Sequence, residues 1–379
     1  MTYDCIIIGL GPAGSSAAYY LAKKGLSVLA LDKEKFPRHK PCGGCVSYKA
    51  EELLPPDFKS VVNNSINGAV FSYKGKKKAE FRGSNGPVGY MVSREIFDAY
   101  LVKKAEEAGA KVKEGERLLD IYDAKNSVIV FSSKGRYKGR YLIGADGANS
   151  SVAKRLGLAK ERRLFLTINA EIKTDSAEDF SDLVEIDIGA IPYGYGWVFP
   201  KNGCLDIGIA SIKDESFNPK KYFLEFIKKR PFLKDIKIEK TYAFRLPTNP
   251  ENTPLNIIGK STLLAGDAAG LTDPLVGEGI YYAIKSGQIA GETVLSLFNK
   301  GSDISNYRER ILKEFISEFN YSWKAAKLIY SMPYFWSAVI KRNIKIVEFY
   351  YKVLRGEETY SSFSRKLKAI MPHPRHKMS

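Results

Sequence analysis

Three glycines near the start of the chain constrain its fold more than any other feature. Gly9, Gly11 and Gly14 follow the apolar segment 3–8, which predicts a short buried strand, and precede a helix that we expect to open at Ser15. In such a unit the first glycine permits a tight turn, the second lets the backbone approach a pyrophosphate, and the third permits close contact between helix and strand. The unpaired N–H groups of the helix N-terminus favour an anion. The turn therefore predicts a dinucleotide-binding site.

A second strand pattern over 27–31 ends at Asp32. An acidic side chain in this position accepts hydrogen bonds from both ribose hydroxyls and repels a 2′-phosphate, so NADP is not expected in this slot. The order of strand, glycine turn, helix and acid distinguishes this motif from an isolated Gly-rich turn. It does not separate NAD from FAD, and that decision needs residues further along the chain.

Net charge and hydropathy limit the partners and the compartment. The chain has 379 residues and a formal net charge of +17. Such a charge favours a phospholipid surface, a pyrophosphate-bearing substrate or nucleic acid, and it is equally compatible with an acidic redox protein or with plain solubility. No recognised nucleic-acid motif is present, so nucleic acid is not an expected partner. No apolar stretch approaches the ~20 residues of a spanning helix and no signal peptide is visible, so we expect a cytoplasmic protein.

The cysteines predict no metal site. Cys5 lies within the first strand pattern and is expected in the core. Cys42 and Cys45 form a C-x-x-C pair, but the second pair of cysteines or histidines that a zinc ribbon needs is missing. A redox-active disulfide between them lacks the strand–CxxC–helix context of thioredoxin-like motifs. His373 and His376 lie in a basic tail and are expected to be solvated.

Buried-strand patterns recur along the chain, with other material inserted between them. This arrangement predicts the α/β class with α+β insertions: a discontinuous Rossmann-like domain, an antiparallel β-sheet substrate domain and a C-terminal helical region. One helix is expected to start at Ser93, which would cap it, with Ile96, Phe97, Tyr100 and Leu101 on one face. The expected boundaries are 1–60, 88–160 and 259–300 for the first domain, 61–87 and 161–258 for the second, and 301–379 for the helical region.

The region 332–354 combines aromatic residues with lysines and arginines. This composition suits a helix that lies at an anionic membrane interface. It also suits packing onto the first domain with the lysines outside, which we favour. Peripheral contact with an anionic membrane is kept as the alternative.

Two further turns pair an acid with glycines after a strand, and a third segment follows them. Asp146 and Asp267 lie in the turns, and the segment 273–280 contains Gly277 and Gly279. Together with the N-terminal glycines, these features resemble the p-hydroxybenzoate hydroxylase-like FAD fold over roughly residues 1–300. The resemblance implies that FAD is the cofactor.

The resemblance also implies roles for individual residues. Asp267 would hydrogen-bond the ribitol or pyrophosphate region, Asp146 would lie close to the pyrophosphate, and Arg94 would contact the phosphate or ribitol side. Leu118 would meet adenine through its backbone. The alternatives are a surface cation for Arg94 and plain core for Leu118. A helix N-terminus at Gly277–Ile280 would stabilise anionic reduced flavin. The expected cofactor contacts are Gly9, Gly11, Ala13, Gly14, Asp32, Cys42, Gly43, Gly44, Val46, Arg94, Leu118, Asp146, Asp267, Gly277, Gly279 and Ile280.

One family within that fold fits more closely. The segment 192–200 matches the P-x-x-Y-x-W-x-F-P motif of geranylgeranyl reductases, and Pro41-Cys42-Gly43-Gly44 resembles that family's segment near the flavin. The chain therefore resembles geranylgeranyl reductases, in particular the digeranylgeranylglycerophospholipid reductases. An aromatic strand with cross-strand pairs and no ligand is the alternative explanation of the first motif.

This resemblance implies saturation of isolated C=C bonds in prenyl chains by hydride from reduced FAD. Tyr195, Trp197 and Phe199 would line one face of a strand and form the walls of an apolar tunnel. The proton would come from Cys42 first, from Tyr195 second, or from water. His39 is the only histidine near the cysteine pair.

Several alternatives stay open. A monooxygenase or halogenase of the same fold is the second enzyme candidate, although the W-x-W-x-I-P strand of halogenases is not reproduced at 195–200. A lipid-binding flavoprotein without turnover is the third candidate. The electron donor is either a ferredoxin or NAD(P)H, since no second nucleotide motif is visible. The substrate is either a prenyl lipid or a prenyl pyrophosphate.

Overall fold

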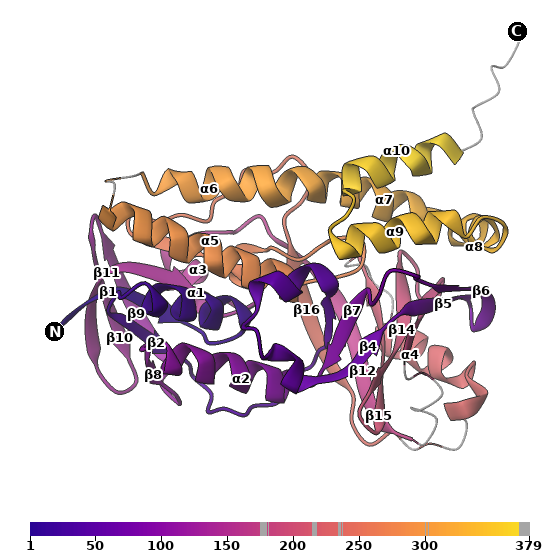
Figure 1. The fold of residues 1–379 in the computed structure, drawn as a ribbon, viewed down its shortest axis with the longest axis horizontal. Coiled ribbons are helices and arrows are strands. Elements are labelled where there is room, and N and C mark those ends of the chain that lie inside the picture. The colour runs from indigo at the N-terminus through magenta and orange to yellow at the C-terminus, as the bar shows by residue number, and fades with distance from the viewer. Residues whose placement is uncertain are drawn as a thin grey trace, which may run out of the picture.

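Two large sheets and one small sheet organise the chain, with helices packed around them (Figure 1). The computed structural model describes residues 1–174, 180, 182–213, 218–233, 236, 238–299, 301 and 303–370. The predictions for His373 and His376 lie outside the described residues. The mixed α/β architecture predicted from the sequence is confirmed.

The first sheet carries the glycine turn. Its strand order is β8-β2-β1-β11-β10-β9, and β17 pairs with β11. Strands β8, β2, β1, β11 and β17 are parallel, whereas β10 pairs antiparallel with β9 and β11. The bounds are Thr2–Ile8 for β1, Val28–Leu31 for β2, Lys111–Lys113 for β8, Leu118–Ala124 for β9, Ser127–Ser132 for β10, Arg136–Gly144 for β11 and Thr262–Leu264 for β17.

Two helices cover this sheet in direct contact with each other. Helix α1 spans Pro12–Lys23 and begins before the predicted Ser15, because the fixed φ of Pro12 suits the first helical turn. Helix α5 spans Ile280–Asn299. A Cβ at Gly287 of α5 would lie 2.1 Å from the Ala13 carbonyl oxygen, so the helices pack backbone to backbone. Cys5 is fully buried in β1, as predicted.

The second sheet contains the aromatic motif. Its strand order is β16-β12-β15-β14-β13-β5-β6. The prediction of an antiparallel sheet is wrong at one pair, because β13 runs parallel to β5. Strand β5 comes from a distant part of the chain, so no hairpin imposes the antiparallel direction. The bounds are Gly68–Tyr73 for β5, Lys76–Arg82 for β6, Arg163–Lys173 for β12, Leu183–Ile188 for β13, Gly194–Lys201 for β14, Cys204–Ser211 for β15 and Tyr242–Thr248 for β16.

The small sheet has the strand order β3-β7-β4, and its strand β7 leads into α2. Ser93 occupies the N-cap of α2, but its side chain makes no capping hydrogen bond. Ile96 is 53% exposed, contrary to the prediction, because the buried face of α2 contains Arg94 and Asp98 beside Phe97. The bounds are Cys45–Ser47 for β3, Val62–Ile66 for β4, Gly89–Val92 for β7, Arg94–Glu107 for α2 and Ser151–Leu156 for α3.

The C-terminal helices cover one face of the second sheet, and α4 (Pro219–Lys228) covers the other (Figure 1). The prediction that region 332–354 packs onto the first domain holds only in part: α8 packs against β5, β6 and β13 of the second sheet, whereas α9 contacts residues 48–53 of the predicted first domain. Its apolar side chains, including Trp336 and Ile340, meet the aromatic side chains of β14 in one cluster. The bounds are Ser305–Ile311 for α6, Ser317–Ser331 for α7, Pro333–Arg342 for α8, Lys345–Arg355 for α9 and Tyr360–Ile370 for α10. Among the described residues, no helix combines the length and the apolar character that crossing a bilayer requires.

Candidate functional site: two adjoining cavities

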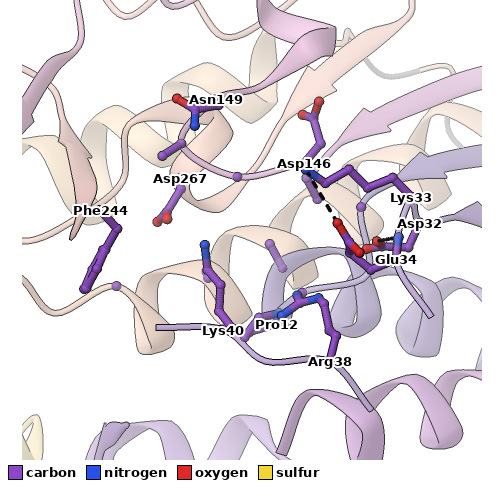
Figure 2. A pocket seen from close by; sticks show the side chains of 18 of the residues that line it. Pro12, Asp32, Lys33, Glu34, Arg38, Lys40, Asp146, Asn149, Phe244 and Asp267 are labelled. Carbon is purple, nitrogen blue, oxygen red and sulfur yellow. Dashed lines mark hydrogen bonds and ion pairs between the residues drawn. The ribbon is translucent and has the colours of Figure 1, made fainter. Parts of the chain in front are cut away.

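A large cavity, called here the dinucleotide cavity, lies at the glycine turn. Its volume is about 990 Å³, which is at the upper end of ordinary ligand sites. Asp32 lies at one end and Phe244 at the other (Figure 2). Gly14 does not line the cavity but packs beneath the turn. Twelve of the predicted cofactor contacts line the cavity: Gly9, Gly11, Ala13, Asp32, Cys42, Arg94, Leu118, Asp146, Asp267, Gly277, Gly279 and Ile280.

The three glycines are required for different reasons. Gly9 has a φ of +93°, and a Cβ there would lie 2.5 Å from the Ala145 carbonyl oxygen. A Cβ at Gly14 would lie 1.8 Å from the Gly9 carbonyl oxygen. Gly11 has ordinary extended backbone, and the nearest atom to its Cβ position is a guanidinium nitrogen of Arg38 at 3.8 Å. The packing of the chain thus explains Gly9 and Gly14, whereas Gly11 leaves backbone open to a ligand, as a pyrophosphate needs.

Asp32 is held in a fixed orientation at its end of the cavity. Its Oδ2 accepts the Leu10 N–H at 2.7 Å, and its Oδ1 accepts the Glu34 N–H at 2.9 Å. A carboxylate has about four acceptor sites, so two remain for ribose hydroxyls. This geometry fits the role expected of Asp32.

Two arginines share one buried carboxylate beside the glycine turn. Arg94 donates to both oxygens of Asp98 at 2.8 Å, and Arg38 Nη2 lies 3.1 Å from Asp98 Oδ2. Asp98 is fully buried and Arg94 is 9% exposed, so Arg94 is not a surface cation. Burial disfavours the guanidinium, but Asp98 more than offsets this and raises the pKa of Arg94. Two cations against one anion leave a positive charge where a pyrophosphate would lie.

Arg38 and Lys40 also line the cavity, and neither was predicted from the sequence. Lys40 is directed toward Asp267 (Figure 2). Burial lowers the pKa of Lys40, and Asp267 acts in the opposite direction. Their position just before Cys42, in a loop rich in proline and glycine, could have indicated that they lie near the cofactor.

Asp146 stabilises the start of α3. Its carboxylate accepts hydrogen bonds from the Ser150 hydroxyl at 2.5 Å and from the Ser151 and Val152 N–H groups at 2.6 and 3.2 Å. Burial raises the pKa of Asp146, whereas these hydrogen bonds act to lower it and offset only part of the effect. Asp146 therefore has a structural role in addition to lining the cavity. Leu118 is 7% exposed and lines the cavity. It can therefore belong to the core and still face a ligand.

The segment Gly277–Ile280 leads directly into α5 and is braced by Asp273. Asp273 Oδ1 accepts the Leu275 N–H at 2.8 Å and the Val276 N–H at 3.0 Å, and Oδ2 accepts the Ser322 hydroxyl at 3.1 Å. Burial raises the pKa of Asp273 to about 6. This carboxyl was not singled out from the sequence as a supporting group.

A second cavity, called here the apolar cavity, adjoins the first. Its volume is about 260 Å³, and Tyr195, Trp197 and Phe199 of β14 line it, as predicted. Neighbouring rings along the strand have centroids 5.9 and 6.1 Å apart. The opposite wall, which was not predicted, comes from the C-terminal helices and contains Tyr330, Trp336, Ile340, Ile346, Val347, Tyr350, Tyr351, Leu354, Phe363 and Leu367.

The two cavities share part of their lining. The shared residues are Cys42, Phe244, Leu246, Gly277, Gly279 and Ile280. Gly43 and Gly44 line only the apolar cavity. Val46 lines neither cavity, because its side chain is fully buried in the core around β3 and β7. The Cys42–Gly44 segment therefore forms part of the wall between the two cavities.

The groups considered as proton donors differ in how they are bonded. The Tyr195 hydroxyl donates to the Val276 carbonyl at 2.5 Å, and burial raises its pKa. Cys42 Sγ accepts the Gly44 N–H at 3.4 Å and also interacts with the Arg94 guanidinium. Cys45 is a free thiol whose pKa burial raises to about 12. His39 packs against Tyr242 in a tilted arrangement with ring centroids 4.5 Å apart, and it lines the dinucleotide cavity.

Comparison with known proteins agrees with this geometry. A family model described as an FAD binding domain matches residues 2–190. A digeranylgeranylglycerophospholipid reductase of Methanocaldococcus jannaschii is 31% identical over 342 residues, which are 88% of this chain and 85% of that protein. A geranylgeranyl diphosphate reductase of Rhodobacter capsulatus is 33% identical over 83% of this chain and 81% of its own. The chain belongs to the geranylgeranyl reductase family. It is an FAD-dependent oxidoreductase.

The structures of related proteins support the same assignment. The crystal structure of a geranylgeranyl bacteriochlorophyll reductase-like protein from Thermoplasma acidophilum superposes with a TM-score of 0.81 at 25% identity, over 98% of this chain and 99% of its own. A flavin-dependent brominase has a TM-score of 0.74 at 22% identity, over 97% of this chain and 99% of its own. The second likeness shows the common fold alone.

Substitution of Gly11 and Gly14 should separate ligand binding from folding. Gly11→Ala places a methyl group in open space, so we expect it to cost at most about 1 kcal/mol of stability while FAD affinity falls at least tenfold. Gly14→Ala forces a clash with the Gly9 carbonyl and should cost about 3 kcal/mol or more. Denaturant unfolding of the FAD-free protein and flavin titration measure the two effects. Equal FAD affinity in Gly11→Ala and wild type would refute the assignment of this turn.

The buried Asp273 should make stability depend on pH. Its pKa in the folded protein is raised from 3.8 to about 6, so folding favours the protonated form. The stabilisation is present below pH 3.8 and is lost as pH rises through about 6, a change of about 3 kcal/mol. Asp273→Asn keeps an acceptor oxygen and removes the titration. Wild type should thus lose about 2 kcal/mol relative to this variant between pH 4 and 7 in urea unfolding. Parallel pH profiles would contradict the raised pKa.

Proposed function

We propose that this protein reduces isolated C=C bonds in the geranylgeranyl chains of lipids or of prenyl pyrophosphate. The observation that carries the proposal is the contact between the two cavities, which share Cys42 and the Gly277–Ile280 segment. The names of the relatives, which refer to geranylgeranyl diphosphate and digeranylgeranylglycerophospholipid, support the substrate class. A cofactor in one cavity would then face a hydrocarbon chain in the other.

The residues of the dinucleotide cavity fit FAD. Asp32 would accept the ribose hydroxyls, and Leu118 would meet the adenine through its backbone. The Gly9–Gly14 turn with Ala13, the Arg94 guanidinium and Asp146 would lie along the pyrophosphate, while Asp267 would bond the ribitol. Cys42, Gly43 and Gly44, together with Gly277, Gly279 and Ile280, would surround the flavin ring, and Val46 would support them from the core. Bound and reduced FAD supplies the hydride.

The apolar cavity would bind the prenyl chain and exclude water. Tyr195, Trp197 and Phe199 give it an aromatic wall, which would also tolerate developing positive charge on the more substituted alkene carbon. None of the described residues that line it is a lysine or an arginine, and Glu278 is held in an ion pair with Lys49 at 2.9 Å. A phosphate headgroup is therefore expected to stay outside this cavity.

The second hydrogen arrives as a proton. Cys42 is our first candidate donor because its thiol lines both cavities. Tyr195 ranks second, because its hydroxyl proton is already donated to the Val276 carbonyl. Water is the third source, and the Cys42–Gly44 segment would then serve to position the flavin.

Reduction requires an external electron donor, either a ferredoxin or NAD(P)H. We also propose peripheral contact with an anionic membrane, because a lipid substrate resides there. Lys341, Arg342 and Lys345 are exposed at the junction of α8 and α9, helices that wall the apolar cavity. Basic side chains beside a lipid-binding cavity favour such a surface.

Incubation of the chemically reduced, anaerobic protein with geranylgeranyl lipid tests the proposal. We expect products two mass units heavier for each bond reduced, detected by mass spectrometry. Oxygen uptake coupled to NAD(P)H consumption would instead indicate a monooxygenase or halogenase. Lipid that binds in liposome flotation but keeps its mass would indicate a binding protein, and either result would overturn the proposed reductase activity.

Narrowing the apolar cavity should act on long chains selectively. Ala210 lines this cavity and pairs with Tyr195 across β14 and β15. Ala210→Phe should lower turnover of geranylgeranyl substrates at least tenfold and affect geranyl substrates less, because added bulk shortens the space for the chain. FAD binding, measured by flavin absorbance, should stay unchanged. An equal loss with both chain lengths would argue against this cavity as the prenyl site.

A further inference from the structure

A buried lysine at the end of the aromatic strand contacts the wall between the cavities. Tyr195, Trp197, Phe199 and Lys201 alternate along β14 and so share one face. The Lys201 ammonium lies 3.1 Å from the Cys42 carbonyl oxygen, to which it donates. It also lies 2.7 Å from Glu171 Oε1 and 3.4 Å from Asp206 Oδ2. The lysine side chain is 5% exposed.

The same carboxylate that faces Lys201 also holds the central aromatic ring. Asp206 is fully buried, and its Oδ1 accepts the Trp197 indole N–H at 2.7 Å. Its Oδ2 accepts the Asn169 amide at 2.7 Å. A Cβ at Gly208 would lie 2.2 Å from the indole ring, so the absence of a side chain there makes room for Trp197. Asp206 thus links Trp197, in the wall of the apolar cavity, to Lys201.

The Cys42–Gly44 segment packs directly on this network. A Cβ at Gly43 would lie 2.9 Å from the Phe199 ring, and a Cβ at Gly44 would lie 3.2 Å from Lys201 Cε. Burial disfavours the Lys201 ammonium, but Asp206 and Glu171 outweigh it and raise its pKa, so it stays charged. A charged donor makes a stronger hydrogen bond to a carbonyl than a neutral one.

We propose that Lys201 is a positioning residue, whose ammonium, held by Asp206 and Glu171, fixes the Cys42–Gly44 segment against Trp197 and Phe199. This inference deepens the proposed function, on which it rests, by assigning a support to the wall between cofactor and substrate. Loss of the ammonium would free the Cys42 carbonyl. The segment would then move relative to the flavin and admit water. The proposed role is in geometry, since Lys201 lines neither cavity.

The same sheet supplies a matched control. Arg230 is 2% exposed and its Nη2 lies 2.6 Å from Glu185 and 3.3 Å from Asp187. Like Lys201, it is a buried cation between two carboxylates. It follows α4 and belongs to the opposite side of the sheet, where Phe226 packs in a separate core cluster. Lys201→Met and Arg230→Met therefore remove comparable charges, but only Lys201 is hydrogen-bonded to Cys42.

The test compares both variants as FAD-loaded proteins. In Lys201→Met we expect an altered flavin absorption spectrum, Cys42 alkylation by iodoacetamide at least fivefold faster, and kcat for prenyl reduction at least tenfold lower with a smaller change in KM. Arg230→Met should keep the spectrum, the alkylation rate and kcat of wild type. Peptide mass spectrometry distinguishes Cys42 from Cys45.

Wild-type spectrum and alkylation rate in Lys201→Met would overturn the proposal, as would equal changes in Arg230→Met. If Lys201→Met does not fold, the double variant Lys201→Met/Asp206→Asn is measured instead, because it removes both charges and keeps an acceptor for Trp197. The spectrum and the alkylation rate need no prenyl turnover. A wild-type protein that leaves prenyl lipids unchanged would thus refute the proposed function without deciding the role of Lys201.

Discussion

The packing of the Cys42–Gly44 segment against β14 is the contact on which the rest of the site depends. The segment leaves the first sheet after Asp32 and reaches Phe199 and Lys201 of the second sheet. Only glycine allows this approach, because a side chain at Gly43 or Gly44 would meet the Phe199 ring, the Val92 carbonyl or Lys201. As a result, one wall separates a polar cavity with surplus cations from an apolar one. This juxtaposition fits a redox cofactor that acts on a hydrocarbon.

The C-terminal helices complete the apolar cavity. An aromatic strand face that was left open would expose Tyr195 and Trp197 to water, yet they are 9% and 4% exposed. Tyr330 of α7 stacks on Tyr195 with centroids 6.2 Å apart, and its hydroxyl bonds the Leu275 carbonyl. Burial of these rings stabilises the contact between helices and sheet. The covering helices are therefore part of the site.

Local signals made much of the fold predictable. The glycine turn, the strand that ends at Asp32 and the strand with Trp197 all follow from short-range patterns that backbone geometry imposes. The parallel β13–β5 pair and the packing of α8 onto the second sheet were not predicted, because both depend on contacts between segments far apart in the sequence. Ile96 was misplaced for a related reason: the pairing of Arg94 with Asp98 buries two charged residues on α2.

The site shows the same division. Motif residues such as Gly11, Asp267 and Trp197 were predicted and line the cavities. The groups that support them were not, since Arg38, Asp273 and Lys201 have no motif of their own. Their surroundings are created by burial and by partners from other elements, as in the sharing of Asp98 by Arg38 and Arg94. A pattern within one segment cannot report such partners.

The most direct test is a crystal structure of the protein with FAD and a geranylgeranyl lipid. We predict the flavin ring between Cys42 and the Gly277–Ile280 segment, with the prenyl chain along Tyr195, Trp197 and Phe199 and in direct contact with the ring. A flavin ring remote from Cys42, or a prenyl chain bound away from Trp197, would contradict it.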